Sequence, residues 1–241
     1  MHGNGRATQD MTREDGSAVD SDAETSVGIP LAEFPLTLAG RSWGIVAARD
    51  HASLMAAIDN FVAFPFGLLL WESAVALAHA LAAQREKVAG KSVLELGAGV
   101  GLPGIVARYL GAAPVRQTDH ITETLSLCRL NAERNGVSGI DLALANWDAW
   151  TDTETYDLII ASDVIYERAA HAALTAILDR NLKPGGRALF ADPGRQDTPL
   201  FLGALAAAGW KSSRQQHTVE SMLPGGADEV GIDIIELWRE P

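Results

Sequence analysis

Cysteine is nearly absent from this 241-residue chain, which has only Cys128. One thiol cannot form a disulfide framework, and no group of cysteines and histidines has the spacing of zinc ligands, so we expect a reducing compartment and no metal site. Neither end has the pattern of a signal peptide, and no apolar run reaches the roughly 18 residues that a membrane span needs. These absences predict a cytoplasmic protein without a membrane partner.

Basic residues are also few: 19 Lys and Arg stand against 31 Asp and Glu, which gives a formal net charge of −12. This balance argues against binding to a nucleic-acid backbone, so we expect no nucleic-acid partner. It is compatible with a basic protein partner, although acidity that serves only solubility explains it equally well.

Residues 1–27 contain six acidic residues, two arginines and few large apolar side chains. This composition predicts a disordered acidic tail. The remaining stretch, residues 28–241, alternates apolar runs with turn signals, and a chain that is 47% hydrophobic can bury one sizeable core. We therefore expect a single folded domain after the tail.

From residue 90 onward the chain repeats a short apolar strand followed by a helical pattern, which is typical of a parallel sheet with helices on both faces. The last two strands are joined by the short segment LPGGAD and must be antiparallel. The sequence therefore predicts an α/β fold with a doubly wound, mostly parallel, seven-stranded sheet that ends in an antiparallel hairpin. The expected strands span 92–96, 114–118, 140–145, 156–163, 187–192, 217–222 and 231–238, and the expected helices 102–110, 122–135, 169–179 and 200–208. Upstream, an apolar stripe within 64–82 predicts a helix packed on the sheet, and residues 41–46 favour a short strand pair.

The stretch LELGAGVGLPG, residues 94–104, contains a literal G-x-G-x-x-G at Gly99, Gly101 and Gly104 after an apolar run. That pattern ordinarily indicates a dinucleotide whose pyrophosphate lies on a helix N-terminus. Glu95, however, is expected at the strand end and pointing into the site, where its carboxylate would repel a diphosphate. A ligand with cationic groups and no phosphate fits this position better.

Two further strand ends indicate a nucleoside. Asp119 follows Gly97 by 22 residues, at the end of the neighbouring strand, where a carboxylate can accept hydrogen bonds from both ribose hydroxyls. Trp147 and Asp148 in ANWDAW offer an aromatic plane and a carboxylate for an adenine ring and its amine. An adenosine that carries cationic groups and no phosphate is S-adenosylmethionine, which we expect as the cofactor.

The segment VLELGAGVG resembles the first motif of the seven-strand class I S-adenosylmethionine-dependent methyltransferases, a Rossmann-like family, and Asp119 matches the second. Together with LLLWESAVALA (68–78), NWD (146–148) and ASDVIY (161–166), it resembles the methyltransferase-like protein-lysine N-methyltransferase branch. DPGR (192–195) is similar to members that modify an electron-transfer flavoprotein subunit, although it is also compatible with a plain turn. The resemblance covers residues 64–195.

This resemblance implies a site and a reaction. The implied cofactor contacts are Trp71, Glu95, Gly97, Ala98, Gly99, Gly101, Asp119, Trp147 and Ala161. The implied catalytic residues are Asp163, which would orient a lysine amine and is a candidate proton acceptor, and Tyr166 at the substrate entrance. The implied partner is a protein that presents a lysine on a basic surface.

Other interpretations of the same residues remain open. Trp71, Trp147 and Tyr166 are compatible with plain packing, and Asp119 or Asp163 with a helix cap. A small-molecule N- or O-methyltransferase would use the same fold, and a silent cofactor-binding module or an NAD-dependent oxidoreductase are further alternatives. A nucleic-acid base methyltransferase is disfavoured because residues 163–166 lack the two prolines of the D-P-P-Y motif.

Overall fold

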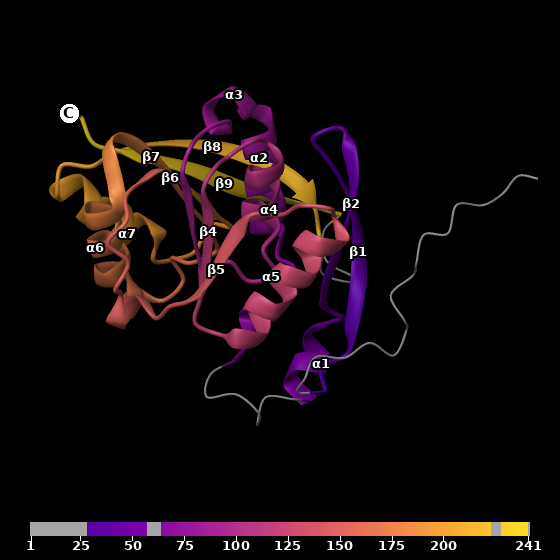
Figure 1. Cartoon of the computed structure of the whole chain (residues 1–241). Helices are drawn as coiled ribbons and strands as arrows, with labels where there is room; N and C mark the ends of the chain where they lie inside the picture. The colour runs from indigo at the N-terminus through magenta and orange to yellow at the C-terminus, as the bar shows by residue number, and fades with distance from the viewer. Residues whose placement is uncertain (1–27, 57–63, 223–227, 241) are drawn as a thin grey trace, which may run out of the picture.

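The computed structural model describes residues 28–56, 64–222 and 228–240. It contains a seven-stranded sheet in the order β5-β4-β3-β6-β7-β9-β8 (Figure 1). The strands are β3 (Val93–Leu96), β4 (Val115–Asp119), β5 (Ile140–Leu144), β6 (Tyr156–Ser162), β7 (Leu182–Asp192), β8 (Lys211–Glu220) and β9 (Glu229–Trp238). The predicted doubly wound, mostly parallel sheet is confirmed. The predicted tail at 1–27 and most of the turn at 223–228 lie outside the described residues.

The order of the strands decides where a ligand can lie. Strands β3 and β6 are parallel neighbours, and the chain runs outward from β3 through β4 to β5 before it returns to β6. The strand order therefore reverses between β3 and β6, and ligands in such sheets lie beyond the carboxyl ends at this point. On the far side, β9 is antiparallel to both β7 and β8, which confirms the predicted terminal hairpin.

Helices cover both faces of the sheet (Figure 1). Helices α2 (Glu72–Ala83), α4 (Leu102–Tyr109) and α5 (Thr122–Arg134) lie on one face, and α6 (His171–Asn181) and α7 (Thr198–Ala207) on the other. The short helix α3 (Arg85–Val88) follows α2. Each face has its own buried apolar cluster. Alternation along β3 places Val93 in the cluster beside α2 and α4, and Leu94 and Leu96 in the cluster beside α6 and α7.

The helix expected within 64–82 begins later than the pattern suggests. Phe66–Leu68 forms a 3-10 turn, η2, and α2 starts at Glu72 after the N-cap Trp71. Pro65 and Gly67, which interrupt helices, explain the delay. The sequence predicted one buried face for this helix, whereas nine of the twelve residues of α2 are buried. They are buried because α2 packs against both α4 and strands β7 to β9.

A second, two-stranded sheet precedes this core. Strands β1 (Leu31–Leu38) and β2 (Arg41–Ala48) pair antiparallel, so the expected strand pair exists and is longer than residues 41–46, and α1 (His51–Ala56) follows it. Buried Asn131 of α5 joins the hairpin to the core: its Oδ1 accepts from Val46 N at 2.7 Å, and its Nδ2 donates to Val46 O and to Val100 O, each at 2.9 Å. One amide therefore anchors both the hairpin and the glycine loop.

The described part of the chain contains no helix long and apolar enough to cross a membrane.

Candidate active site

The residues predicted from the motifs gather at the carboxyl ends of adjacent strands. The glycine loop follows β3, Asp119 ends β4, Asp163 follows β6, and the DPGR segment begins at the end of β7. The 3-10 turns η2 and η3 (Trp147–Ala149) contribute from the sides. Because β4, β3, β6 and β7 are consecutive neighbours, these segments meet beyond the carboxyl ends of the strands at the switch point of the sheet, where ligands of such folds lie, and we refer to this place as the crevice.

The glycine loop is held in a conformation that other residues rarely adopt. Gly97 and Gly99 have φ values of 63° and 54°. Gly99 N donates to Asp119 Oδ2 at 3.0 Å, and the Cys128 thiol donates to Gly99 O at 3.1 Å. A Cβ on Gly99 would lie 3.1 Å from Gly67 O. The loop is thus fixed from β4, from α5 and from η2, and its backbone stays accessible at Gly97 and Gly99.

The prediction that the Glu95 carboxylate faces the ligand is wrong. Glu95 is 1% exposed, and its side chain lies on the α4 face of β3, inside the protein. Its Oε2 accepts from Gly104 N at 3.1 Å and from Gln117 Nε2 at 2.6 Å. Burial raises the pKa of Glu95 to about 8, although the hydrogen bonds to Gln117 and Gly104 oppose this shift. Glu95 is therefore mostly protonated at neutral pH and supports the loop from beneath.

Packing explains why the last two positions of the motif, Gly101 and Gly104, are glycines. Gly101 is the N-cap of α4 with φ 86°, and a Cβ there would lie 2.9 Å from Cys128 Sγ. A Cβ on Gly104 would lie 2.4 Å from Glu95 Oε2. These two glycines make room for interior side chains, and the literal G-x-G-x-x-G is therefore no sign of a diphosphate here.

Replacing Gly101 with alanine should lower the free energy of unfolding by about 2 to 4 kcal/mol, from the overlap with Cys128 and the left-handed backbone. Gly136 is the control, since its φ is 65° and no described atom lies within 4 Å of an added Cβ. Gly136→Ala should cost only about 1 kcal/mol. Urea denaturation measures both losses. Equal losses in the two variants would contradict a steric role for Cys128.

Asp119 is placed where the ribose acceptor was expected. It is 5% exposed, and its Oδ2 accepts from Gly99 N while its Oδ1 accepts from Ile121 N, both at 3.0 Å. It does not cap α5, because Ile121 occupies the N-cap position and no side chain caps that helix. Each oxygen retains a lone pair that can accept from a further hydroxyl.

The two tryptophans flank the crevice from different elements. A Cβ on Gly97 would lie 3.3 Å from Cζ2 of Trp147, so the Trp147 ring is beside the loop. Trp71 donates from Nε1 to Phe66 O at 2.9 Å, and its ring centroid lies 6.2 Å from that of Phe66. Phe66, 43% exposed, in turn contacts the ring of Tyr166 at 6.0 Å. Sequence reasoning missed Phe66, whose position depends on the turn before α2.

Two alanines complete the list of predicted cofactor contacts. Ala161 pairs with Leu96 inside the sheet and is 0% exposed, so the prediction that it contacts a ligand is wrong. The last residue of β6 is Ser162, which is partly exposed, and Asp163 follows it. Ala98 is 5% exposed, and its N donates to Thr118 O at 2.9 Å, which ties the loop to β4.

Asp163 and Tyr166 lie together at the end of β6. Asp163 has φ 52°, which is unusual for a residue with a side chain, and its N donates to Ala191 O at 2.8 Å. The Arg195 guanidinium donates to both Asp163 oxygens, from Nε to Oδ1 at 2.8 Å and from Nη2 to Oδ2 at 2.5 Å. Asp163 therefore forms an ion pair and does not cap a helix, and the DPGR segment supplies the arginine of that ion pair. Sequence reasoning missed Arg195, although its place at the end of a strand adjacent to β6 was a usable signal.

Tyr166 is 46% exposed at the rim of the crevice. Burial raises the pKa of Tyr166, and the negative charges of Glu167, Asp163 and Asp119 raise it further. The hydroxyl is therefore protonated at neutral pH and can donate a hydrogen bond. Carboxylates that follow β6 and end β4 thus both raise the pKa of this hydroxyl.

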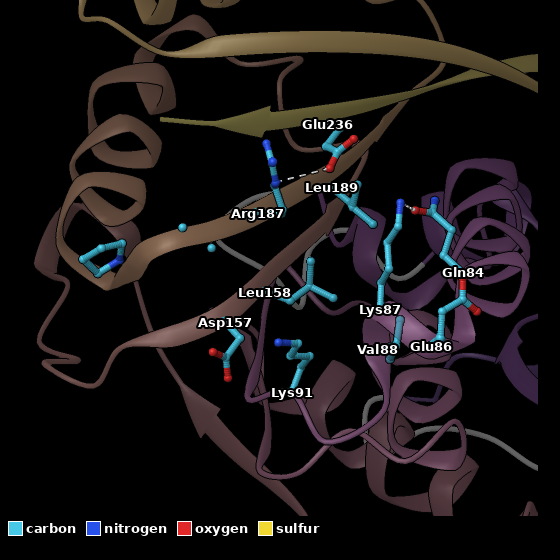
Figure 2. Close-up of a pocket in the computed structure, with 13 residues that line it drawn as sticks. Gln84, Glu86, Lys87, Val88, Lys91, Asp157, Leu158, Arg187, Leu189 and Glu236 are labelled. Carbon is cyan, nitrogen blue, oxygen red and sulfur yellow. Dashed lines mark hydrogen bonds and ion pairs between the residues drawn. The ribbon is translucent and has the colours of Figure 1, made fainter. Parts of the chain in front are cut away.

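A cavity of about 510 Å³ lies elsewhere (Figure 2). Its lining includes Lys91 just before β3, Asp157 and Leu158 at the start of β6, and Arg187 in β7. These positions are at the amino ends of the strands, opposite the crevice. The cavity therefore shares no residue with the motifs that the sequence singled out.

The comparisons with known proteins agree with this geometry. A family described as lysine methyltransferase matches residues 53–201, which is more than half of the chain and includes both the glycine loop and Arg195. A solved structure of ribosomal protein L11 methylase from Lactobacillus delbrueckii subsp. bulgaricus is similar, with a TM-score of 0.56 and 25% identity over 72% of this chain and 81% of that one.

Two curated relatives show the same similarity at the level of sequence. Histone-arginine methyltransferase METTL23 of Xenopus laevis is 32% identical over 49% of this chain and 53% of its own length. The electron transfer flavoprotein beta subunit lysine methyltransferase of Danio rerio is 31% identical over 54% of this chain and 51% of its own length. The chain thus spans about half the length of the curated relatives it matches. With the family match covering the strand ends that form the crevice, the chain belongs to the lysine methyltransferase family.

Proposed function

We propose that this protein transfers a methyl group from S-adenosylmethionine to the side-chain amine of a lysine in a protein substrate. The observation that carries the proposal is the position of Asp163 and Tyr166 at the end of β6, next to the glycine loop and Asp119, in a chain of the lysine methyltransferase family. Of the predicted cofactor contacts, we retain Trp71, Gly97, Gly99, Asp119 and Trp147, with Ala98 and Gly101 as backbone support.

The residues fit an adenosine that bears cationic groups. The Asp119 carboxylate has lone pairs free for ribose hydroxyls, and Trp147 lies beside Gly97 where an adenine ring could pack. A diphosphate would face Asp119 and Asp163, and the guanidinium of Arg195 is already paired with Asp163. Because Arg195 compensates the charge of Asp163, the electrostatic preference for a sulfonium over a diphosphate comes from Asp119 and not from Glu95.

When bound, the cofactor supplies an electrophilic methyl group on a sulfonium. The protein has to align the acceptor nitrogen and exclude water. Each Asp163 oxygen accepts one hydrogen bond from Arg195 and keeps a lone pair that can accept from the lysine nitrogen. The rings of Tyr166 and Phe66, whose centroids are 6.0 Å apart, form the wall of the entrance, where the protonated Tyr166 hydroxyl can donate a hydrogen bond. Asp163 thus orients the amine.

We further propose a protein partner that presents its lysine on a basic surface, without nucleic-acid or membrane partners. The overall charge of −12 supports a basic partner. The buried, single Cys128 supports a reducing, cytoplasmic compartment.

The test is incubation of the protein and a cell lysate with S-adenosylmethionine labelled in its methyl group, followed by mass spectrometry of the labelled residues. We expect methyl-lysine in a protein. Methyl-arginine would contradict the lysine assignment, label confined to metabolites would indicate a small-molecule methyltransferase, and cofactor binding without any transfer would indicate a silent binding module.

Asp163→Ala is the matched negative variant. It should bind S-adenosylhomocysteine with near-normal affinity and lose roughly tenfold or more of the transfer rate, because the acceptor nitrogen is no longer oriented. Asp141→Ala, on the exposed side of β5, should retain full activity. A fully active Asp163→Ala variant would give Asp163 a structural role only.

A further inference from the structure

The contact between Arg195 and Asp163 is built from two sides of the crevice. Arg195 lies three residues beyond the end of β7, and Asp163 one residue beyond the end of β6. The guanidinium donates from Nε and Nη2 to the two oxygens of one carboxylate, the fork geometry that fixes both groups in position. The Asp163 side chain is only 9% exposed, whereas that of Arg195 is 40% exposed.

The backbone around both residues is arranged for this contact. Asp192 Oδ1 accepts from Gly194 N and from Arg195 N, both at 2.9 Å, which fixes the turn that carries Arg195. Asp163 N donates to Ala191 O, and its φ of 52° is a conformation that surrounding contacts must maintain. The ion pair is therefore part of the framework of the site.

The surroundings of the pair are mostly acidic. Asp119, Glu167 and Asp192 act electrostatically on Tyr166 or Arg195, and Tyr166 acts on Arg195. The segments that follow β6 and β7 also carry His171 and the Arg168–Asp197 ion pair. The hydrogen bond with Asp163 is the main reason that the pKa of Arg195 is raised, so its positive charge persists. The charge of Arg168 is already paired with Asp197 at 2.7 Å. An acceptor amine at Asp163 would thus meet several carboxylates, with Arg195 as the cation that compensates the closest of them.

The positive charge of Arg195 matters because only the neutral form of the lysine amine is a nucleophile. An isolated carboxylate beside a lysine favours the ammonium form and would slow transfer. A carboxylate whose charge is already compensated by an arginine favours the ammonium form less. Resting on the proposed function above, we propose that Arg195 is a positioning residue that holds Asp163 as one half of a neutral pair, so that the acceptor meets an oriented hydrogen-bond acceptor and not a bare negative charge.

The first experiment needs no protein acceptor. Binding of n-butylamine, which is an ammonium at pH 7, is measured by calorimetry on the full-length protein loaded with S-adenosylhomocysteine. Arg195→Gln should bind this probe about tenfold more tightly than the wild type, because Asp163 becomes an uncompensated charge. Arg195→Lys keeps the positive charge and should bind it much as the wild type does. Equal or weaker binding by Arg195→Gln would overturn the proposal.

The second experiment uses the lysine peptide identified by the labelling test. For Arg195→Gln, the midpoint of the kcat–pH profile should move up by about one pH unit and KM should fall, while Arg195→Lys should keep the midpoint near that of the wild type. A uniform loss of kcat at every pH, with an unchanged midpoint, would reduce Arg195 to a structural role and overturn the proposal.

Arg187→Gln is the matched control, since it removes an arginine from an ion pair with Glu236 at the opposite, amino ends of the strands, and it should change neither measurement. Thermal unfolding of every variant establishes that the fold is retained. If the wild type transfers no methyl group, the proposed function fails, and the n-butylamine measurement still decides the role of Arg195.

Discussion

At pH 8.5, the Glu95→Gln variant should have a free energy of unfolding on the order of 4 kcal/mol higher than that of the wild type, and near pH 5 the two should be close. Burial raises the pKa of Glu95 from its ordinary 4.5 to about 8. Between these values the unfolded chain ionises and the folded protein does not, so the folded state binds more protons and the stability of the wild type falls as pH rises. The loss is complete once pH passes the pKa of the folded state. A glutamine side chain does not ionise, so the Glu95→Gln variant does not lose this stability.

The interior around Glu95 explains why ionisation is costly there. Its Oε1 and Gln117 Oε1 are both buried and have no hydrogen-bond partner among the described residues. A carboxylate oxygen without a donor is poorly stabilised, so the protonated form is favoured. Urea denaturation at pH 5, 7 and 8.5 gives the comparison, with Glu86→Gln on the exposed helix α3 as the control that should leave the pH dependence unchanged. Parallel stability curves for Glu95→Gln and the wild type would contradict this account.

Asp119→Ala should weaken the binding of S-adenosylhomocysteine by about 2 to 3 kcal/mol, or roughly 30- to 150-fold. The variant loses the acceptor for the ribose hydroxyls, and it also loses the bond that holds Gly99 N, so the loop is less ordered before binding. Isothermal titration calorimetry measures the affinity.

Asp141→Ala is the control for this measurement, because its exposed carboxylate on β5 pairs with Arg116 of β4 and lies away from the crevice. Thermal unfolding of the free variants separates a loss of binding from a loss of fold. An unchanged affinity in a folded Asp119→Ala variant would remove Asp119 from the cofactor site.

Most of the fold could be predicted from the sequence because the periodicity of apolar residues changes at each boundary. The pattern placed all seven strands of the main sheet and the helices between them, with boundaries that agree closely at β3, α4, β4 and α5. It was less accurate where local signals compete with packing. The helix expected within 64–82 starts only at Glu72. Strand β7 begins at Leu182, five residues before its expected start, and its pairing with β6 is irregular there.

The candidate site was predicted in outline and corrected in detail. Asp119, Asp163 and the glycine loop are at the strand ends, as expected from a parallel sheet. Ala161 lies inside the sheet, two residues before Asp163, and Glu95 is on the covered face of its strand. A motif gives positions along the chain, whereas the burial of each side chain depends on the neighbouring strands and on the helix that covers that face.

The sequence by itself determined the class of fold, the order of the elements and the edge of the sheet where the proposed site lies, because these follow from local periodicity and from the rule that parallel strands end together. Only the tertiary structure decided which charged side chains lie at that site. Burial beneath α4 neutralises Glu95 at neutral pH, and the adjacency of β6 and β7 brings Arg195 to Asp163 across 32 positions of the chain. Desolvation and ion pairing depend on neighbours distant in sequence, and no local pattern specifies them.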